Sequence, residues 1–334
     1  MKCSARQASN FRETLKAMKP GSLHVIINPA SAGGRTGKQL DNIIRAVRET
    51  ANGECSFSIT TKPSEATRLT ATAIDRGCEA VLAVGGDGTI QEVVNGFFSN
   101  GHMVNPECQL GVLSNGTGQG FGQSLGVQGS LKAQLDHFWN GQVLLVDLGR
   151  VAFANAGGRN VFRYFLNECQ AGIGGAVVKQ VGLNHKALGG KVAFGYATLR
   201  TVFFHKNQSM TIRADGRAIS GRFTGVVIAN GAYTGGGMNL APGAMMDDGY
   251  LDLLLMHEMT VVQRLQSFSL IYSGKHVGTD YFTYRRVKSV SLEASEPVLL
   301  EADGELLGAM PCSVEVIPRI LPVRVPARKR AFNE

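Results

Sequence analysis

One stretch, an apolar strand followed by a glycine-flanked carboxylate and a helix, constrains the fold of this chain most. Residues 79–84 are almost continuously apolar, which is typical of a strand buried on both faces of a parallel sheet. Three glycines around Asp87 allow a tight turn and a close approach of a ligand to the backbone. Helical spacing of apolar residues from Thr89 onward predicts a helix N-terminus, whose free N–H groups favour phosphate. We therefore expect a phosphate-binding loop around Asp87; in the alternative, Asp87 or Thr89 merely caps the helix.

Three more strands are predicted in the first 140 residues, and two of them end in loops of small residues. The strand predicted over 23–27 leads into NPASAGGRTGK at 28–38, and the strand over 109–113 leads into SNGTGQGFG at 114–122. Alternation over 56–61 predicts the other strand. Neither loop has Walker A or GxGxxG spacing, which argues against P-loop enzymes and dinucleotide-binding Rossmann domains. Because loops after parallel strands gather at one sheet edge, we expect them to share one ligand site.

The pattern changes from residue 143 onward, where short strand-like segments alternate with turns. These segments are 161–166, 209–213, 222–229, 250–256, 287–293 and 312–317. Helical patterns occur only over 176–204 and 260–273. The fold class predicted is an N-terminal parallel α/β nucleotide-binding domain followed by a mostly antiparallel β-sandwich domain.

Composition narrows the partners and the compartment. The net charge of +8 favours acidic partners, namely nucleotide phosphates or an anionic membrane surface. No basic stretch is interleaved with aromatic residues, so nucleic acid is not expected. The six cysteines form no CxxC pair, which favours reduced thiols over disulfides or zinc. No apolar run approaches the ~18 residues of a membrane span, so we expect a cytoplasmic protein that at most contacts a membrane peripherally; homodimer formation stays open.

Several separated motifs resemble one family. GGDGTIQEVVNG, the NPASAGG loop, the Gly-Thr-Gly loop, APGAMMDDGYLDL and ADGE occur in an order that is similar to the diacylglycerol kinase catalytic-domain family, which includes bacterial lipid kinases and the sphingosine and ceramide kinases. The resemblance covers about residues 23–325. It implies a first domain similar to those of NAD kinases and phosphofructokinases, to which the last strand returns. The domain prediction is therefore an extension over 1–20, an α/β domain over 21–146 with 319–334, and a β-sandwich lipid-acceptor domain over 147–318.

The resemblance implies an ATP-dependent lipid kinase that uses Mg²⁺ and acts on diacylglycerol or a related lipid at a membrane surface. Asp87 would act with Mg²⁺ near the transferred phosphoryl group. The residues implied to contact the nucleotide are Asn28, Pro29, Ser31, Gly33, Gly34, Thr60, Gly85, Gly86, Asp87, Gly88, Thr89, Glu92, Gly116, Thr117 and Gly118. Thr61 is the alternative to Thr60.

Two acidic turns in the second half are implied to complete the site. Asp248, with the main-chain carbonyls of Met245 and Tyr250, would hold a magnesium ion, although the pattern also fits a plain glycine turn. In ADGE, either Asp303 or Glu305 would take the proton of the acceptor hydroxyl. By pattern alone ADGE predicts a hairpin with an Asp-Gly turn.

Two other functions remain open. An NAD kinase would share GGDG, but the NPASAGG loop and the DDGYLDL turn argue against it. A catalytically silent nucleotide- or lipid-binding protein is the second, because Gln91, Gln119 and Gly120 depart from residues common in the family. The apolar helix predicted over 191–204 is either a core helix or the acyl-chain entrance, and the basic residues 328–330 are either a solvated tail or an attraction for anionic lipid.

Overall fold

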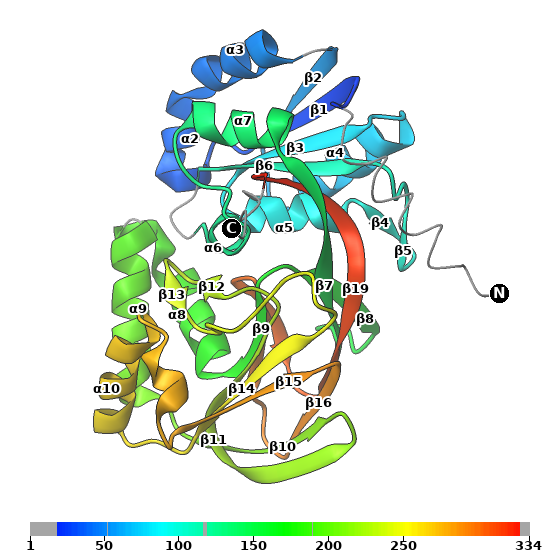
Figure 1. Cartoon of the computed structure of the whole chain (residues 1–334). Coiled ribbons are helices and arrows are strands. Elements are labelled where there is room, and N and C mark those ends of the chain that lie inside the picture. The colour runs from blue at the N-terminus through cyan, green and yellow to red at the C-terminus, as the bar shows by residue number, and fades with distance from the viewer. Residues whose placement is uncertain (1–18, 52, 116–118, 189, 328–334) are drawn as a thin grey trace, which may run out of the picture.

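The computed structural model describes residues 19–51, 53–115, 119–188 and 190–327, and Figure 1 shows an α/β half joined to a β half. Four strands of the α/β half run parallel in the order β2-β1-β3-β6. Their bounds are β1 (Ser22–Ile27), β2 (Glu54–Ile59), β3 (Ala80–Gly85) and β6 (Gln109–Ser114). The carboxyl ends of these strands therefore lie along one edge, as the loop sequences predicted.

Helices cover both faces of the parallel sheet. Val25 and Ile27 pack with α3 and α7 on one face, whereas Ile26 packs with α4 and α5 on the other, as alternation along a strand requires. The helices are α3 (Leu40–Thr50), α4 (Glu65–Asp75), α5 (Asp87–Asn95) and α7 (Leu131–Asn140). The shorter elements of this half are η1 (Ser31–Gly34), α2 (Arg35–Lys38), β4 (Phe98–Ser99), β5 (His102–Met103) and α6 (Gly120–Ser124).

The β half is built from antiparallel pairs. Its strands are β7 (Gln142–Ala154), β8 (Asn160–Phe165), β9 (Glu168–Gly172), β10 (Gln208–Ala214), β11 (Arg217–Ala229), β12 (Tyr233–Thr234), β13 (Met238–Asn239), β14 (Leu251–His257), β15 (Phe282–Val287), β16 (Ser289–Ala294), β17 (Leu299–Ala302), β18 (Glu305–Ala309) and β19 (Cys312–Val325). The predicted fold class is confirmed: a parallel α/β region precedes a mostly antiparallel β region.

Helices of the β half gather along one side of its strands (Figure 1). They are α8 (Ile173–Leu188), α9 (Gly190–Phe204), α10 (Val261–Ile271) and the short η2 (Lys275–Gly278). The single helix predicted over 176–204 is thus two helices, and the sequence has two glycines at 189–190, where helix formation is weakest. No helix in the described ranges is long and apolar enough to cross a membrane.

Two long strands, β7 and β19, run through both halves. β19 pairs antiparallel with β7 along most of its length and pairs parallel with β6 at Val323 and Leu110. Val146 and Leu148 of β7 and Leu321 and Val323 of β19 are fully buried in a core that includes residues of the parallel sheet. The two halves therefore share a continuous sheet and a packed core, which fixes the loops of one half against the strands of the other.

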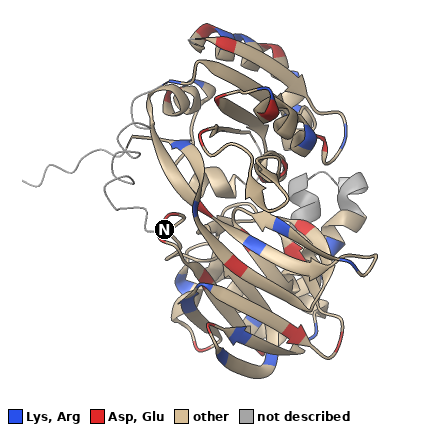
Figure 2. Cartoon of the chain, turned by 90° about the vertical axis from the view of Figure 1, so that its right-hand side faces the viewer, with Lys and Arg blue, Asp and Glu red and all other residues tan. Residues whose placement is uncertain are grey.

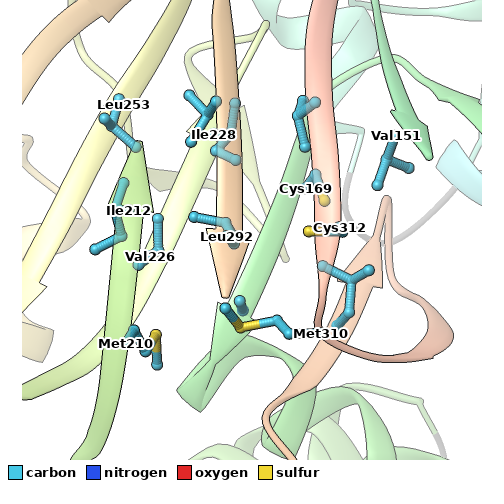
Figure 3. Packing of buried hydrophobic residues seen from close by; sticks show 14 of the residues in the cluster. Val151, Cys169, Met210, Ile212, Val226, Ile228, Leu253, Leu292, Met310 and Cys312 are labelled. Carbon is cyan, nitrogen blue, oxygen red and sulfur yellow. The ribbon is translucent and has the colours of Figure 1, made fainter. Parts of the chain in front are cut away.

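The core of the β half contains side chains from several strands. Figure 3 shows Ile212, Ile228, Leu253 and Leu292 meeting between the strands, and each is at most 1% exposed. Truncation of such a side chain to alanine costs about 2–5 kcal/mol. On the surface, Figure 2 shows basic and acidic residues mixed along the strands of this half, so neither sign dominates this face.

Candidate active site

The loops after β1, β3 and β6 are hydrogen-bonded to one another at the carboxyl edge of the parallel sheet. The amide of Asn28, which follows β1, donates to the hydroxyl of Thr89 at the start of α5 at 2.9 Å. The amide of Asn115, which follows β6, donates to the hydroxyl of Thr36 at 3.1 Å. The first loop is therefore tied to both of its neighbours, and the predicted convergence is present.

The first loop turns through left-handed backbone at Ala32, Gly33 and Gly34, with φ of 56°, 67° and 83°. The hydroxyl of Ser31 donates a hydrogen bond to the carbonyl of Asn28 at 2.8 Å and shares another with the hydroxyl of Thr36 at 2.6 Å. These two hydrogen bonds hold the loop in shape. A Cβ added to Gly33 or Gly34 would meet nothing within 4 Å. The glycines are needed for backbone conformation, and the space above them is open to a ligand.

The central loop has a packed side and an open side. A Cβ on Gly85 would lie 2.6 Å from the side chain of Thr89, so only glycine fits at the end of β3. Gly86 is the N-cap of α5 in extended conformation. Gly88, in the first turn of α5, has nothing within 4 Å of its Cβ position. The N-terminus of α5 is therefore accessible to an anion.

Asp87 joins this loop to the next one. Its carboxylate accepts hydrogen bonds from the main-chain N–H groups of Gly120 at 3.1 Å and Phe121 at 3.2 Å, at the start of α6. Burial raises the pKa of Asp87, and these two hydrogen bonds partly oppose that rise. A Cβ on Gly120 would lie 2.6 Å from the carbonyl oxygen of Tyr233, so glycine is the residue that fits here. The departure at Gly120 is thus part of how Asp87 is held.

Three other residues predicted to contact the nucleotide, Thr60, Glu92 and Pro29, form hydrogen bonds within the protein. Thr60 follows the edge strand β2 and is 8% exposed, with its N–H donating to the carbonyl of Ile27 at 2.9 Å. The carboxylate of Glu92 accepts from the N–H groups of Ser64 and Ala66 and thereby caps α4. The Pro29 carbonyl accepts from the first loop's own backbone. Gly116, Thr117 and Gly118 lie outside the described residues.

Two acidic residues that the sequence reasoning missed, Glu168 and Glu301, lie beside Asp303. Glu168 begins β9 and Glu301 lies on β17, and they are 4% and 1% exposed. Both line the same cavity as Asp87 and Asp303. For Glu301, a charge among the apolar residues of β17 is the signal that could have identified it, because buried carboxylates seldom occur without a role or partner. Glu168 begins β9 after Asn167 and carries no such signal.

Asp303 is held by the backbone of a distant segment. Its carboxylate accepts from the N–H groups of Leu166 at 2.6 Å, Asn167 at 2.8 Å and Glu168 at 3.2 Å. Burial raises the pKa of Asp303 to about 7, against the lowering effect of these hydrogen bonds, and the charge of Asp87 raises it further. The side chain is therefore oriented and titrates near neutral pH.

The neighbouring acids keep their protons more firmly. Burial and the charge of Asp303 raise the pKa of Glu301 to about 8, although the N–H of Gly304 donates to its carboxylate. Burial and the surrounding carboxylates raise the pKa of Glu168 well above its usual range. Thr234 donates to one oxygen of Glu168, and the other oxygen has no hydrogen-bond partner among the described residues. Of Asp303, Glu301 and Glu168, Asp303 is consequently the residue whose pKa lies nearest to neutral pH.

Glu305, the other candidate base, lies on β18 next to the turn. Its carboxylate forms an ion pair with Arg163 at 3.4 Å, and its side chain is 37% exposed. Burial raises the pKa of Glu305, and Arg163 lowers it. Glu305 does not line the cavity that Asp303 faces. The structure therefore places Asp303 at the cavity and Glu305 outside it, a difference that the ADGE motif alone did not predict.

A cavity of about 230 Å³ runs from this acidic cluster into the β half. Its wall is otherwise mostly apolar and comes from α8, α9, α10 and the strands β14 and β15. It includes Ile173, Val177, Val178, Met256, Phe268 and Phe282. Four carboxyl groups at one end of an apolar cavity can receive a hydroxyl whose attached chain is apolar.

The carboxylate of Asp248, in the turn before β14, is paired with the side chain of Arg286. The guanidinium of Arg286 donates to the Asp248 carboxylate and lies 4.6 Å from the Tyr250 ring centroid. The N–H of Tyr250 also donates to Asp248 at 3.0 Å. A magnesium ion held by Asp248 with the carbonyls of Met245 and Tyr250 would compete with Arg286 for the carboxylate, so this metal site stays a prediction.

The two remaining departures from the family, Gln91 and Gln119, do not line the cavity. Gln91 is fully buried in α5, and neither atom of its amide group has a hydrogen-bond partner in the described part of the chain. Gln119 is the N-cap of α6, with φ of 51°, and its side chain donates to the carbonyl of Ser114 at 3.1 Å.

Known proteins share this organisation along most of the chain. Residues 22–151 match the diacylglycerol kinase catalytic domain, and residues 168–325 match the YegS C-terminal NAD kinase beta sandwich-like domain. The diacylglycerol kinase of Bacillus subtilis (strain 168) is 27% identical over 307 residues, which cover 91% of this chain and 96% of that protein. The diacylglycerol kinase of Staphylococcus carnosus (strain TM300) is 27% identical over 289 residues, which cover 86% and 90%.

A solved structure shows the same fold. The crystal structure of a diacylglycerol kinase from Bacillus anthracis str. Sterne superimposes with a TM-score of 0.72 at 22% identity and covers 92% of this chain and 98% of that one. Both family models match in the order of the two halves described above. The chain therefore belongs to the diacylglycerol kinase catalytic-domain family and carries a YegS-like C-terminal domain.

Proposed function

We propose that this chain is an ATP-dependent lipid kinase that transfers the γ-phosphate of ATP to a hydroxyl of diacylglycerol or a related lipid. The position of Asp87 carries the proposal. Its carboxylate lies where the glycine loops meet, and the same residue lines the apolar cavity. A kinase that acts on a lipid requires such a junction, because its two substrates differ in polarity and must meet at one phosphoryl group.

The nucleotide side would bind the triphosphate mainly through backbone. Gly33, Gly34 and Gly88 leave open space, and the N-terminus of α5 offers unpaired N–H groups. Asn28 and Thr89 would hold the loops in register through their mutual hydrogen bond. Thr60 and Glu92 would act indirectly, since the N–H of Thr60 bonds the carbonyl of Ile27 just before the first loop and Glu92 caps α4.

Asp87 is the residue that fits a magnesium ion. Mg²⁺ in kinases is held by one or two carboxylates together with phosphate oxygens and water. In the described ranges no three His, Cys, Asp or Glu side chains are placed to hold one ion. Mg²⁺, when bound, neutralises charge on the phosphates. We do not assign the Asp248 turn to the metal, because Arg286 already balances its charge.

We assign the proton transfer to Asp303 rather than Glu305. Asp303 faces the cavity, three backbone N–H groups orient it, and its pKa of about 7 suits a base at neutral pH. Glu301 and Glu168 stay protonated there, so they add little negative charge against an ionised Asp303. The acceptor hydroxyl would give its proton to the Asp303 carboxylate as the phosphoryl group transfers.

The acceptor would enter from a membrane surface along α9. Val202 of α9 is 4% exposed and lines the cavity, whereas Leu199, Phe203 and Phe204 are 53%, 46% and 77% exposed. One helix therefore borders the cavity and also presents large apolar side chains outward, which is typical of a membrane-contacting surface. Peripheral membrane contact of a cytoplasmic protein is the localisation that this arrangement supports.

We also propose the domain division at 21–146 with 319–334 for the nucleotide domain and 147–318 for the acceptor domain. The bridging strands β7 and β19 belong to both cores, so the boundary falls within paired strands. The site lies at that boundary, because Asp87 comes from one domain and Asp303 from the other.

The test is transfer of label from γ-labelled ATP, with Mg²⁺, to diacylglycerol in mixed micelles, beside a parallel reaction with NAD. We expect labelled lipid and no labelled dinucleotide, because the cavity wall is apolar. Label in NAD would identify an NAD kinase. ATP binding without transfer to any lipid would indicate a silent binding protein.

A further inference from the structure

Arg264 is a buried cation in the wall of the apolar cavity, and an acyl-chain site alone gives it no role. The residue lies on α10, is 7% exposed, and lines the cavity together with Met259 and Phe268. Burial of a guanidinium is costly unless hydrogen bonds or an anion compensate for the lost hydration. Its hydrogen-bond partners are therefore informative.

The chain itself supplies little compensation. Nη1 of Arg264 donates to the main-chain carbonyl of His205 at 2.7 Å, just beyond the end of α9. Its buried Nε has no hydrogen-bond partner, and no carboxylate within the described ranges forms an ion pair with it. Burial and the charge of Arg264 lower the pKa of His205 to about 4, so that imidazole is neutral at pH 7. Arg264 is thus an isolated positive charge with unused donors.

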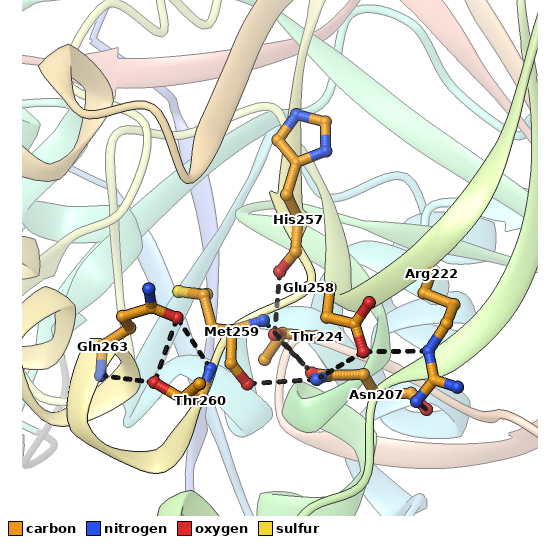
Figure 4. Close-up of polar contacts among 8 residues, drawn as sticks. All are labelled: Asn207, Arg222, Thr224, His257, Glu258, Met259, Thr260 and Gln263. Carbon is orange, nitrogen blue, oxygen red and sulfur yellow. Dashed lines mark hydrogen bonds and ion pairs between the residues drawn. The ribbon is translucent and has the colours of Figure 1, made fainter.

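A network of hydrogen bonds fixes the start of the helix that carries Arg264. Figure 4 shows the capping box of α10, in which Thr260 and Gln263 bond reciprocally. The side chain of Asn207 donates to the carbonyl of Met259 at 3.0 Å and accepts from the hydroxyl of Thr224 at 2.8 Å. Arg264, one residue after this box, is therefore held in the cavity wall by a rigid framework.

The arginine and the carboxylates lie at opposite ends of the cavity. Arg264 donates to the carbonyl of His205, whose ring is hydrogen-bonded to the carbonyl of Thr224 on β11. Glu168, by contrast, pairs with Ala229 at the carboxyl end of the same strand. Both Arg264 and Asp87 line the cavity, and most of the other lining residues are apolar. An occupant that satisfied both ends would have a hydroxyl at one end of an apolar chain and an acidic group at the other.

We propose that Arg264 forms an anion subsite that binds the carboxylate or phosphate of an amphiphile whose apolar chain lies in the cavity. In the kinase reaction, the acceptor would be a hydroxylated lipid with an acidic group remote from the hydroxyl. This assignment of the acceptor rests on the proposed function, but the anion subsite itself needs no turnover.

The test compares binding of dodecanoate, dodecyl phosphate and dodecanol to the full chain by calorimetry. The parent is expected to bind both anions more tightly than the alcohol. Arg264→Gln can still donate to the His205 carbonyl but carries no charge. It should lose about tenfold or more in anion affinity, the size of a charge-assisted hydrogen bond, with little change for dodecanol. Arg213→Gln removes an exposed charge on β10, paired with Glu293, and should bind like the parent.

Equal affinity of the parent for dodecanoate and dodecanol would overturn the subsite, as would unchanged anion binding in a folded Arg264→Gln variant. Should that variant not fold, the parent's preference decides, and Arg264→Lys is expected to retain it. A labelling arm compares ω-hydroxydodecanoate with dodecanediol as acceptors. Transfer to both at equal rates would leave the kinase proposal standing and refute the subsite. Anion-selective binding with no transfer to any lipid would support the subsite and refute the kinase proposal.

Discussion

The nucleotide side and the acceptor side of the site differ in how the chain builds them. On the nucleotide side, each loop follows its own strand, and its contacts are short side chains and backbone, as in the bond between Asn28 and Thr89. On the acceptor side, buried carboxylates are held by segments more than a hundred residues away, as Asp303 is by Leu166 and Asn167. The proposed phosphate-binding loops are therefore encoded locally, whereas the proposed acid-base site depends on the assembled fold.

The largest effect is expected on the acceptor side, from Asp303→Asn. Loss of the base should lower kcat by about 10²–10⁴-fold, with ATP affinity unchanged because the loops are untouched. Glu305→Gln is the matched control, since its carboxylate pairs with Arg163 outside the cavity and its loss should leave most of the activity. Steady-state kinetics on both variants check this. An inactive Glu305 variant beside an active Asp303 variant would move the base to Glu305.

The next effect concerns the loop that holds Asp87. Gly120→Ala would place a Cβ 2.6 Å from the carbonyl of Tyr233, and the strain should cost about 1–3 kcal/mol of unfolding free energy and reduce kcat. Gly88→Ala meets nothing within 4 Å in the free chain, so its melting temperature should not fall, although its KM for ATP should rise. Thermal unfolding and ATP titration separate the two. Equal melting temperatures for the two variants would contradict the packing described here.

The acceptor side should also give the enzyme its pH dependence. Because Asp303 must be ionised and its pKa is about 7, kcat should fall about tenfold per pH unit below that value. The pKa of Asp303 and that of Glu301, about 8, are raised above their unfolded values. The folded state thus binds more protons, and this contribution to stability should decline as pH rises from about 4 to 8. A pH profile of kcat that stays flat down to pH 5 would exclude Asp303 as the base.

The smallest effect is expected at the exposed apolar side chains of α9, which we propose contact the membrane. Phe203→Ser Phe204→Ser should raise the apparent KM for lipid in vesicles severalfold, because these exposed rings would no longer enter the bilayer. ATP binding should not change. Phe162→Ser, at a ring on β8 that is 45% exposed, is the control. If both sets of substitutions give the same liposome-dependent activity as the parent, α9 does not contact the membrane.

The contrast between the two sides also explains what could be predicted from the sequence. The strand-and-glycine patterns at 28–38 and 79–96 predicted the parallel sheet and the convergence of its loops, because strand, turn and helix signals are local. The separation of Asp303 from Glu305 could not be predicted. It depends on the pairing of β17 with β9, which places the turn against Leu166 and Asn167.

Glu168 and Glu301 were missed for a related reason. Glu301 lies in the predicted ADGE hairpin and Glu168 follows the strand predicted over 161–166. Nothing local shows that β17 pairs with β9, which brings both residues to one cavity. Arg264 likewise looks like a polar residue of an amphipathic helix until its burial is known. Charged residues among the apolar residues of a predicted strand or helix are therefore candidates for buried functional groups.

The most direct test of the junction between the two sides is Asp87→Asn, with ATP binding, lipid binding and single-turnover transfer measured separately. If Asp87 is the residue at which the nucleotide and the acceptor meet, both binding affinities should stay close to those of the parent while transfer of label to lipid is largely lost. A folded Asp87→Asn variant that phosphorylates lipid at the parent's rate would contradict the central role given to this carboxylate.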